Sequence, residues 1–261
     1  MSKREFYDRV KKATVAIIME LPNSLPQKFF AIVGSGFCIH SAGVIATSES
    51  VFRTFFDKRA YQELVKGLPE NLRPIEHCQI SQQPQVMICA DIRDGQLFAP
   101  VVGVTEVVTG LGFDITLFKL PKHGAFPGGY HTIEIADFNE LHEMQEIAIC
   151  GFPLCEGLFD RLETVSSSFT TGTISSIAPR AGVSASEVKG YELDLTATIG
   201  NVGGPVFSLE SGKVFGVLQG SVRRPRIRAL DSIAKAEPIH PAIEHGVIQS
   251  LIDGTHRPPG L

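Results

Sequence analysis

Residues 200–205 read Gly-Asn-Val-Gly-Gly-Pro, and a strand-like run at 206–209 follows directly. Glycine adopts backbone conformations that other residues avoid, so three glycines in five positions predict a tight loop. At the centre of the loop stands Val202, whose side chain offers only methyl groups. The stretch therefore predicts a tight turn that presents backbone groups and no reactive side chain.

Strand-like runs separated by turn signals extend outward from this loop along the whole chain. The sequence contains 25 Gly and 16 Pro, which suits many short strands joined by tight turns. The predicted strands are 14–19, 29–39, 43–46, 86–90, 97–108, 115–120, 132–135, 146–150, 167–177, 191–195, 206–209 and 214–222. Short, regularly spaced strands indicate an all-β barrel or sandwich architecture.

Three segments carry the spacing of three and four between apolar residues that is typical of a helix. The first is a short amphipathic helix at 2–12, with Phe6, Tyr7 and Val10 on its apolar face. The second is a helical insertion at 51–68, and the third a C-terminal helix at 241–252. We thus expect a mainly β fold with three short helical additions.

The composition is that of an ordinary globular protein, with 43% hydrophobic and 20% charged residues. No apolar run approaches the length of a membrane span, and the N-terminus lacks the features of a signal peptide. The five cysteines are odd in number and irregularly spaced, which favours reduced thiols over a disulfide framework. We therefore predict a cytoplasmic protein that does not associate with membranes.

Four stretches, in order along the chain, resemble the trypsin-like peptidases of the HtrA (DegP) group. They are 34–39 with 42–51, then 114–120, then 147–153 with 171–176, and finally the loop 200–205. The resemblance implies an all-β fold of two six-stranded antiparallel barrels. It also implies a single protease-homologue domain over 1–261, with lobes at about 14–121 and 131–252 and a Gly- and Pro-rich linker at about 122–130.

The same resemblance places the three catalytic roles of the family at Ser50, Asp114 and Val202. A serine peptidase needs a hydroxyl nucleophile, an imidazole base and a carboxylate that orients the base. Val202 cannot attack a carbonyl, and Ser50 has no basic lone pair near neutral pH, so only Asp114 keeps the family's residue type. The resemblance also assigns the oxyanion loop to Gly200, Asn201 and Val202, whose backbone can still bind a carbonyl oxygen.

We therefore predict a catalytically inactive homologue, a pseudoprotease, that binds a protein or an extended peptide segment through the former substrate cleft. In the family, the strand at Leu218, Gln219, Gly220 and Ser221 pairs with extended substrate. Asp114 is expected to serve as a structural hydrogen-bond acceptor, with the Ser50 hydroxyl or a backbone N–H as its partner. The glycine loop is kept either for packing or for binding.

Three alternatives stay open at the level of sequence. The chain is an interaction protein whose working surface lies outside the cleft, a hydrolase that uses other residues, or an engineered inactive peptidase. His40 and Cys155 are the residues considered for a rescued activity. Engineering normally introduces a single alanine, so serine and valine at the two positions favour a natural origin.

Other motifs do not support a cofactor or a polyanion as ligand. Cys150 and Cys155 lack a second ligand pair at zinc spacing, and the glycines at 34 and 36 lack the third glycine of a dinucleotide loop. The net charge of −4 disfavours nucleic acid. A basic run of Arg223, Arg224, Arg226 and Arg228 is read either as a solvated face or as a contact for an acidic partner.

Overall fold

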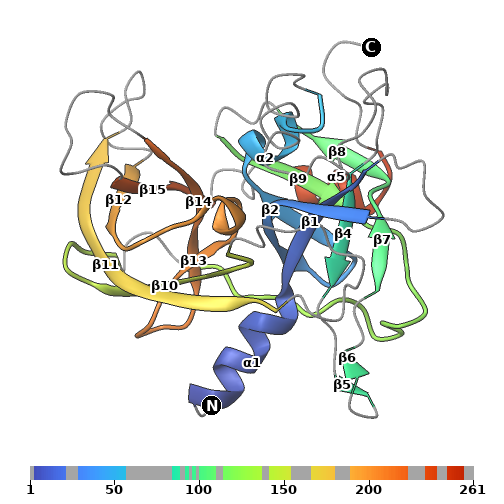
Figure 1. Ribbon diagram of the computed structural model, residues 1–261, viewed down its shortest axis with the longest axis horizontal. Coiled ribbons are helices and arrows are strands. Elements are labelled where there is room, and N and C mark those ends of the chain that lie inside the picture. The colour runs from blue at the N-terminus through green and yellow to red at the C-terminus, as the bar shows by residue number, and fades with distance from the viewer. Residues whose placement is uncertain are drawn as a thin grey trace.

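The computed structural model describes residues 3–21, 29–56, 84–88, 92–93, 96–97, 100–109, 114–136, 141–153, 166–179, 189–222, 233–239 and 246–255. These residues form two β-rich lobes that lie side by side, with helix α1 (Lys3–Ala13) below their junction (Figure 1). Helix α1 runs without a break into strand β1 (Thr14–Leu21) of the first lobe. The predicted N-terminal helix is thereby confirmed.

The first lobe is an antiparallel sheet, and one continuous segment of the chain supplies the strands at both of its edges. Its strand order is β7-β4-β1-β2-β3-β9-β8. Besides β1, the strands are β2 (Phe29–His40), β3 (Val44–Thr47), β4 (Gln85–Ile88), β7 (Val101–Gly103), β8 (Glu106–Val108) and β9 (Thr116–Lys119). Only Val104 and Thr105 separate β7 from β8, so one extended segment pairs with β4 at one edge and with β9 at the other. Counted as one strand, this segment gives the six strands expected. A separate two-stranded hairpin consists of β5 (Ile92–Arg93) and β6 (Gln96–Leu97).

The second lobe is a closed barrel of six antiparallel strands in the order β10-β11-β12-β15-β14-β13. These strands are β10 (Glu146–Gly151), β11 (Ser168–Pro179), β12 (Lys189–Asp194), β13 (Pro205–Ser208), β14 (Val214–Val222) and β15 (Ile233–Pro238). Strand β15 was not predicted, because its sequence Ile-Ala-Lys-Ala-Glu-Pro is poor in β-branched and aromatic residues. Strand β15 pairs with β12 on one side and β14 on the other, and this pairing stabilises it despite the weak local preference. The predicted all-β, double-barrel class is confirmed.

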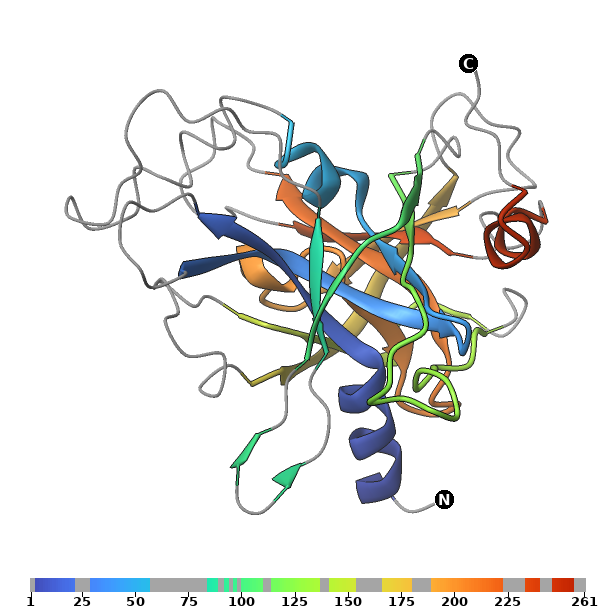
Figure 2. The same cartoon turned by 90° about the vertical axis from the view of Figure 1, so that its right-hand side faces the viewer.

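A shared hydrophobic cluster joins the two lobes and the helices. It contains Phe37 of β2 and Phe207 of β13, together with Val10 of α1 and Leu251 of α5 (Val247–Ile252). All four side chains are buried. Figure 2 shows α5 against the first lobe although it comes last in the chain. The lobes therefore share one core at their junction, and burial of this apolar area favours their association.

Several predicted segments differ from the structure. The strand predicted at 132–135 is wrong: this segment makes only an isolated bridge, between Ile135 and Val214. Its backbone forms hydrogen bonds to both lobes. The Ile133 N–H donates to the Cys38 carbonyl of the first lobe (3.1 Å), and the Ala136 N–H donates to the Val214 carbonyl of the second (2.7 Å). A ladder with one strand is therefore impossible. The run at 97–108 is divided among β6, β7 and β8.

The two predicted longer helices are only partly covered by the described residues. Helix α2 (Glu49–Arg53) begins two residues before the predicted start of 51, and residues 57–68 lie outside the described part. Helix α5 covers the end of the segment predicted at 241–252, and 241–245 also lie outside. Within the described part of the chain, no helix is both long enough and apolar enough to cross a membrane.

Candidate functional site

The carboxylate of Asp114 receives hydrogen bonds from both lobes. Asp114 lies just before β9 and is half-buried. Its Oδ2 accepts from the Ser48 hydroxyl (2.9 Å) in the first lobe and from the Gln219 Nε2 (2.9 Å) on β14 of the second lobe. The expected Ser50 hydroxyl bonds to Ser48 instead of to Asp114. The Ser50 backbone N–H, the other kind of partner expected, does interact with this carboxylate and lowers its pKa. Gln219 was predicted as part of a peptide-binding edge, and its side chain is engaged with Asp114.

Ser48 links the hydroxyl of Ser50 to this carboxylate through two hydrogen bonds. Ser48 is the N-cap of α2, with extended backbone and a side-chain oxygen that accepts from the Ser50 N–H (3.2 Å). The two serine hydroxyl oxygens lie 2.7 Å apart. Because the single hydroxyl hydrogen of Ser48 points to Asp114, Ser50 must donate to Ser48. A chain of hydroxyl groups thus runs from Ser50 through Ser48 to Asp114.

Burial, more than any neighbouring charge, governs the electrostatics of Asp114. Desolvation raises the pKa of its carboxyl, and the hydrogen bond from Ser48 opposes this rise. Arg53 also lowers this pKa slightly, but its guanidinium is held by Glu49 at 2.7 and 3.1 Å. Among the described residues, no Lys or Arg forms an ion pair with Asp114. Neutral hydrogen-bond donors, and no paired cation, therefore hold this carboxylate.

The loop 200–205 is anchored to the first lobe through the buried Ser35 of β2. The Ser35 N–H donates to the Val202 carbonyl (2.7 Å), and its hydroxyl donates to the Gly200 carbonyl (2.7 Å). Ser35 Oγ also accepts from the Phe152 N–H (3.1 Å), and its carbonyl accepts from the Thr47 hydroxyl (2.7 Å). Ser35 thus uses every polar group it has, and the loop is fixed at the junction of the lobes.

The predicted oxyanion residues sit at the start of this loop, in a 3₁₀ turn (Ile199–Asn201) and just after it. Val202 is half-buried and packs against the core cluster of the first lobe. The Asn201 side chain is buried, and its Oδ1 has no partner among the described residues.

The α2 helix and the loop 200–205 lie together around Gly34. A Cβ atom at Gly34 would lie 2.5 Å from a methyl of Val51, the residue after Ser50, and 2.9 Å from the Val202 carbonyl oxygen. The structure therefore brings Ser50, Asp114 and Val202 to one region between the lobes. Ser48 and Ser35 belong to the same region and were missed. A serine just before an acidic helix start was the available signal for Ser48.

The comparisons with known proteins agree with this geometry. A model of the trypsin-like peptidase domain family matches residues 34–217, which is more than half of the chain.

The chain belongs to the trypsin-like peptidase family.

Solved members of the family's HtrA type share the fold. The HtrA-type protease AlgW, solved with a decapeptide, is 16% identical and superposes with a TM-score of 0.60 over 98% of this chain and 69% of that one. Deg5 is 17% identical, with a TM-score of 0.59 over 97% of each chain. No curated protein sequence matches the chain. The likeness to both structures is in fold, as the resemblance in sequence implied.

The four residues of the predicted peptide-binding edge differ in availability. Leu218 is buried, and its N–H and carbonyl are bonded to the carbonyl of Gly204 (2.9 Å) and the N–H of Gly203 (2.8 Å). Gly220 and Ser221 fall within a register shift between β14 and β15. The side of β14 away from β15 pairs with β13 only up to Val217. Beyond Leu218, no described strand occupies that side.

The other sequence candidates show no catalytic arrangement among the described residues. His40 Nδ1 accepts from the Ala42 N–H (3.1 Å) and so stabilises its own turn. Burial raises the pKa of the Cys38 thiol to about 12 and that of Cys150 to about 11, which makes both poor nucleophiles. Cys155 and the run Arg223 to Arg228 lie outside the described residues. In the described part of the chain, no cluster of three His, Cys, Asp or Glu is placed to hold a metal ion.

Gly203 is the position where the loop tolerates no side chain. Its φ is +85°, and a Cβ there would lie 2.2 Å from the Ser35 carbonyl oxygen. We expect Gly203→Ala to lower the free energy of unfolding by roughly 2–4 kcal/mol, measured by urea denaturation. Gly103→Ala is the matched control, since a Cβ at Gly103 meets nothing within 4 Å. Equal stability of the two variants would contradict the described loop.

The raised pKa of Asp114 predicts a pH-dependent stability. The folded protein holds this proton more tightly than the unfolded chain, so stability falls as the pH rises from the unfolded pKa through the folded pKa. Asp114→Asn stays uncharged and is expected to melt above the wild type at neutral pH. The difference should shrink as the pH falls below the pKa of the folded carboxyl. Thermal melts across this range test it, and a wild type that melts higher at neutral pH would contradict it.

Proposed function

We propose that this chain is a catalytically inactive member of its family that binds an extended segment of a partner polypeptide in the former substrate cleft. The observation that carries the proposal is Val202 at the position of the nucleophile, beside a carboxylate that is bonded to hydroxyl and amide groups. Removing the nucleophile or the base of a serine protease costs about a millionfold in turnover. With both replaced, no covalent route through these positions exists.

The hydroxyl chain from Ser50 does not substitute for the lost base. Its terminal acceptor is a carboxylate that already holds the Ser48 and Gln219 donors at 2.9 Å each. A serine hydroxyl in the chain has no lone pair that is basic near neutral pH, unlike imidazole. The network is therefore suited to hold the cleft in shape, and Asp114 acts in it as a structural acceptor.

The edge of β14 supports retained binding. Beyond Leu218, no described strand occupies the side of β14 away from β15. An extended peptide that adds to such an edge gains main-chain hydrogen bonds without any chemistry. The fold neighbour AlgW was solved with a decapeptide, which is consistent with peptide binding by this type of protein. We further propose that the protein acts in the cytoplasm, as a single domain.

A bulky residue at Gly220 should block this edge. We expect Gly220→Trp to weaken the binding of fluorescein-labelled β-casein, an unfolded polypeptide, by about tenfold or more in fluorescence anisotropy. Gly190→Trp on β12 is the matched control, because a Cβ at Gly190 meets nothing within 4 Å. The casein recovered from each sample should be intact by mass spectrometry.

Two results would refute the proposal in different ways. Unchanged casein affinity of the Gly220→Trp variant would place the working surface outside the cleft. Casein fragments that accumulate with the wild type would show that the chain is an active hydrolase.

A further inference from the structure

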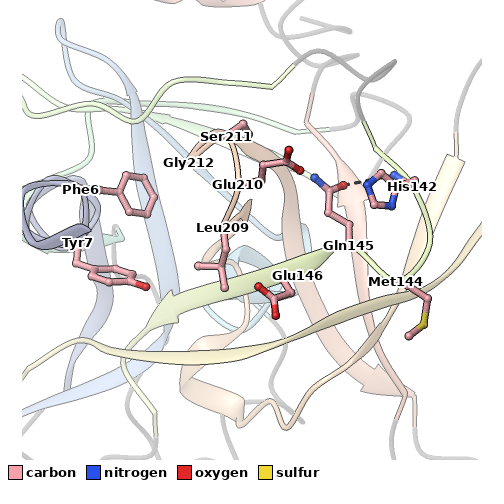
Figure 3. A pocket seen from close by; sticks show the side chains of 10 residues that line it. All are labelled: Phe6, Tyr7, His142, Met144, Gln145, Glu146, Leu209, Glu210, Ser211 and Gly212. Carbon is pink, nitrogen blue, oxygen red and sulfur yellow. Dashed lines mark hydrogen bonds between the residues drawn. The ribbon is translucent and has the colours of Figure 1, made fainter. Parts of the chain in front are cut away.

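A pocket of about 620 Å³ lies on the second lobe, at the side where α1 crosses it (Figure 3). Three segments form it: α1, the turn that leads into β10, and the turn between β13 and β14. The lining residues are Phe6, Tyr7, His142, Met144, Gln145, Glu146, Leu209, Glu210, Ser211 and Gly212. None of them belongs to the region between the lobes around Asp114 and Val202. The pocket is therefore separate from the site of the proposed function.

The walls of this pocket are held in place before any ligand binds. The Phe6 ring lies over Gly212, where a Cβ would come within 2.7 Å of it, and packs edge-on against Phe207 at 5.4 Å. The buried Gln145 donates from Nε2 to the Ser208 hydroxyl oxygen (2.9 Å). That oxygen also accepts from the Glu210 N–H (3.2 Å). A preformed pocket avoids part of the ordering cost of binding.

The pocket presents negative charge that nothing described neutralises. Glu146 and Glu210 are both exposed, and neither carboxylate has a hydrogen bond or ion pair within the described residues. The ten lining residues include no Lys and no Arg. The His142 ring nitrogen Nδ1 lies 2.9 Å from the Glu143 carbonyl oxygen and so is turned to its own backbone. A cationic group is the complementary ligand.

A second, independent feature lies at the rim. Met144 is 75% exposed and has φ +66°, the only positive φ of a non-glycine residue among those described. Such a conformation is strained and persists at functional positions when the surroundings enforce it. Here it holds a flexible apolar side chain in solvent at the rim of the pocket. Methionine is well suited to contact varied apolar partners.

We propose that this pocket is a second binding site, which takes an arginine side chain and the adjoining apolar residue of a partner polypeptide. The planar guanidinium bonds carboxylates in pairs and stacks on aromatic rings, which Phe6 and Tyr7 supply on the facing wall. Met144 and Leu209 cover the apolar neighbour. The volume lies in the range of about 300–1,000 Å³ found for ligand pockets, which suits more than one side chain.

The test uses the peptide acetyl-Gly-Leu-Arg-Leu-Gly-amide and its twin with citrulline, the neutral isostere of arginine. We expect the arginine peptide to shift the amide NMR signals of Phe6, Gln145 and Gly212 of the full-length protein, saturably. The citrulline peptide should bind at least about tenfold more weakly. The double variant Glu146→Gln with Glu210→Gln should bind the arginine peptide more weakly than the wild type by a similar factor.

A matched control removes one exposed carboxylate elsewhere. Asp253→Asn, at the end of α5, should leave the affinity for the arginine peptide unchanged. Met144→Gly should raise the melting temperature, because glycine relieves the positive φ. The same variant should bind the arginine peptide more weakly, because it lacks the methionine side chain. This variant separates a folding defect from a lost contact.

Several outcomes would overturn the proposal. They are equal affinity for the citrulline peptide, an unchanged affinity of the Glu146 and Glu210 double variant, and signal shifts confined to residues outside the pocket. Spermidine that binds as tightly, with the same shifts at Met144 and Leu209, would assign the pocket to small polyamines and overturn the polypeptide partner. None of these results depends on the cleft, so a failed cleft-binding experiment leaves this test intact.

Discussion

One buried serine fixes the junction on which the rest of the structure depends. Ser35 belongs to the first lobe, and it bonds the carbonyls of Gly200 and Val202 and the N–H of Phe152 in the second. Because each polar group is buried, an unmade bond would leave an unpaired donor or acceptor in the core. The loop must therefore approach Ser35 closely, and a positive φ at Gly203 makes that approach possible. The tight glycine loop is required by packing, whatever ligand the cleft holds.

If the chain is catalytically inactive, as we propose, the same requirement explains why the loop is kept. Its glycines serve the lobe junction, and valine at the central position leaves the bonds to Ser35 in place. Asp114 is similar, since Ser48 and Gln219 satisfy the carboxylate from two lobes and leave it no need of an imidazole. Geometry and reactivity are thus separable here. A cleft can keep its shape and its backbone donors after the acid–base machinery is gone.

The fold was predictable because it depends on local patterns, whereas the contacts of the site were not. Strand runs separated by turns indicated an all-β barrel or sandwich, and the resemblance to the HtrA group implied two barrels. The closed second barrel agrees with both. The isolated bridge at Ile135 escaped prediction because an alternating apolar pattern looks the same in a strand and in a segment bonded to two lobes. Gln219 was identified for its place on β14, but its bond to Asp114 joins residues 105 positions apart. Long-range contacts of this kind leave no periodic signal.

Covalent labelling by a fluorophosphonate probe, measured by intact mass, tests the central claim most directly. If the proposed cleft keeps its geometry and lacks only the two reacting side chains, the wild type forms no adduct. The double variant Ser50→His with Val202→Ser then forms one adduct. An adduct on the wild type at any serine would contradict the claim.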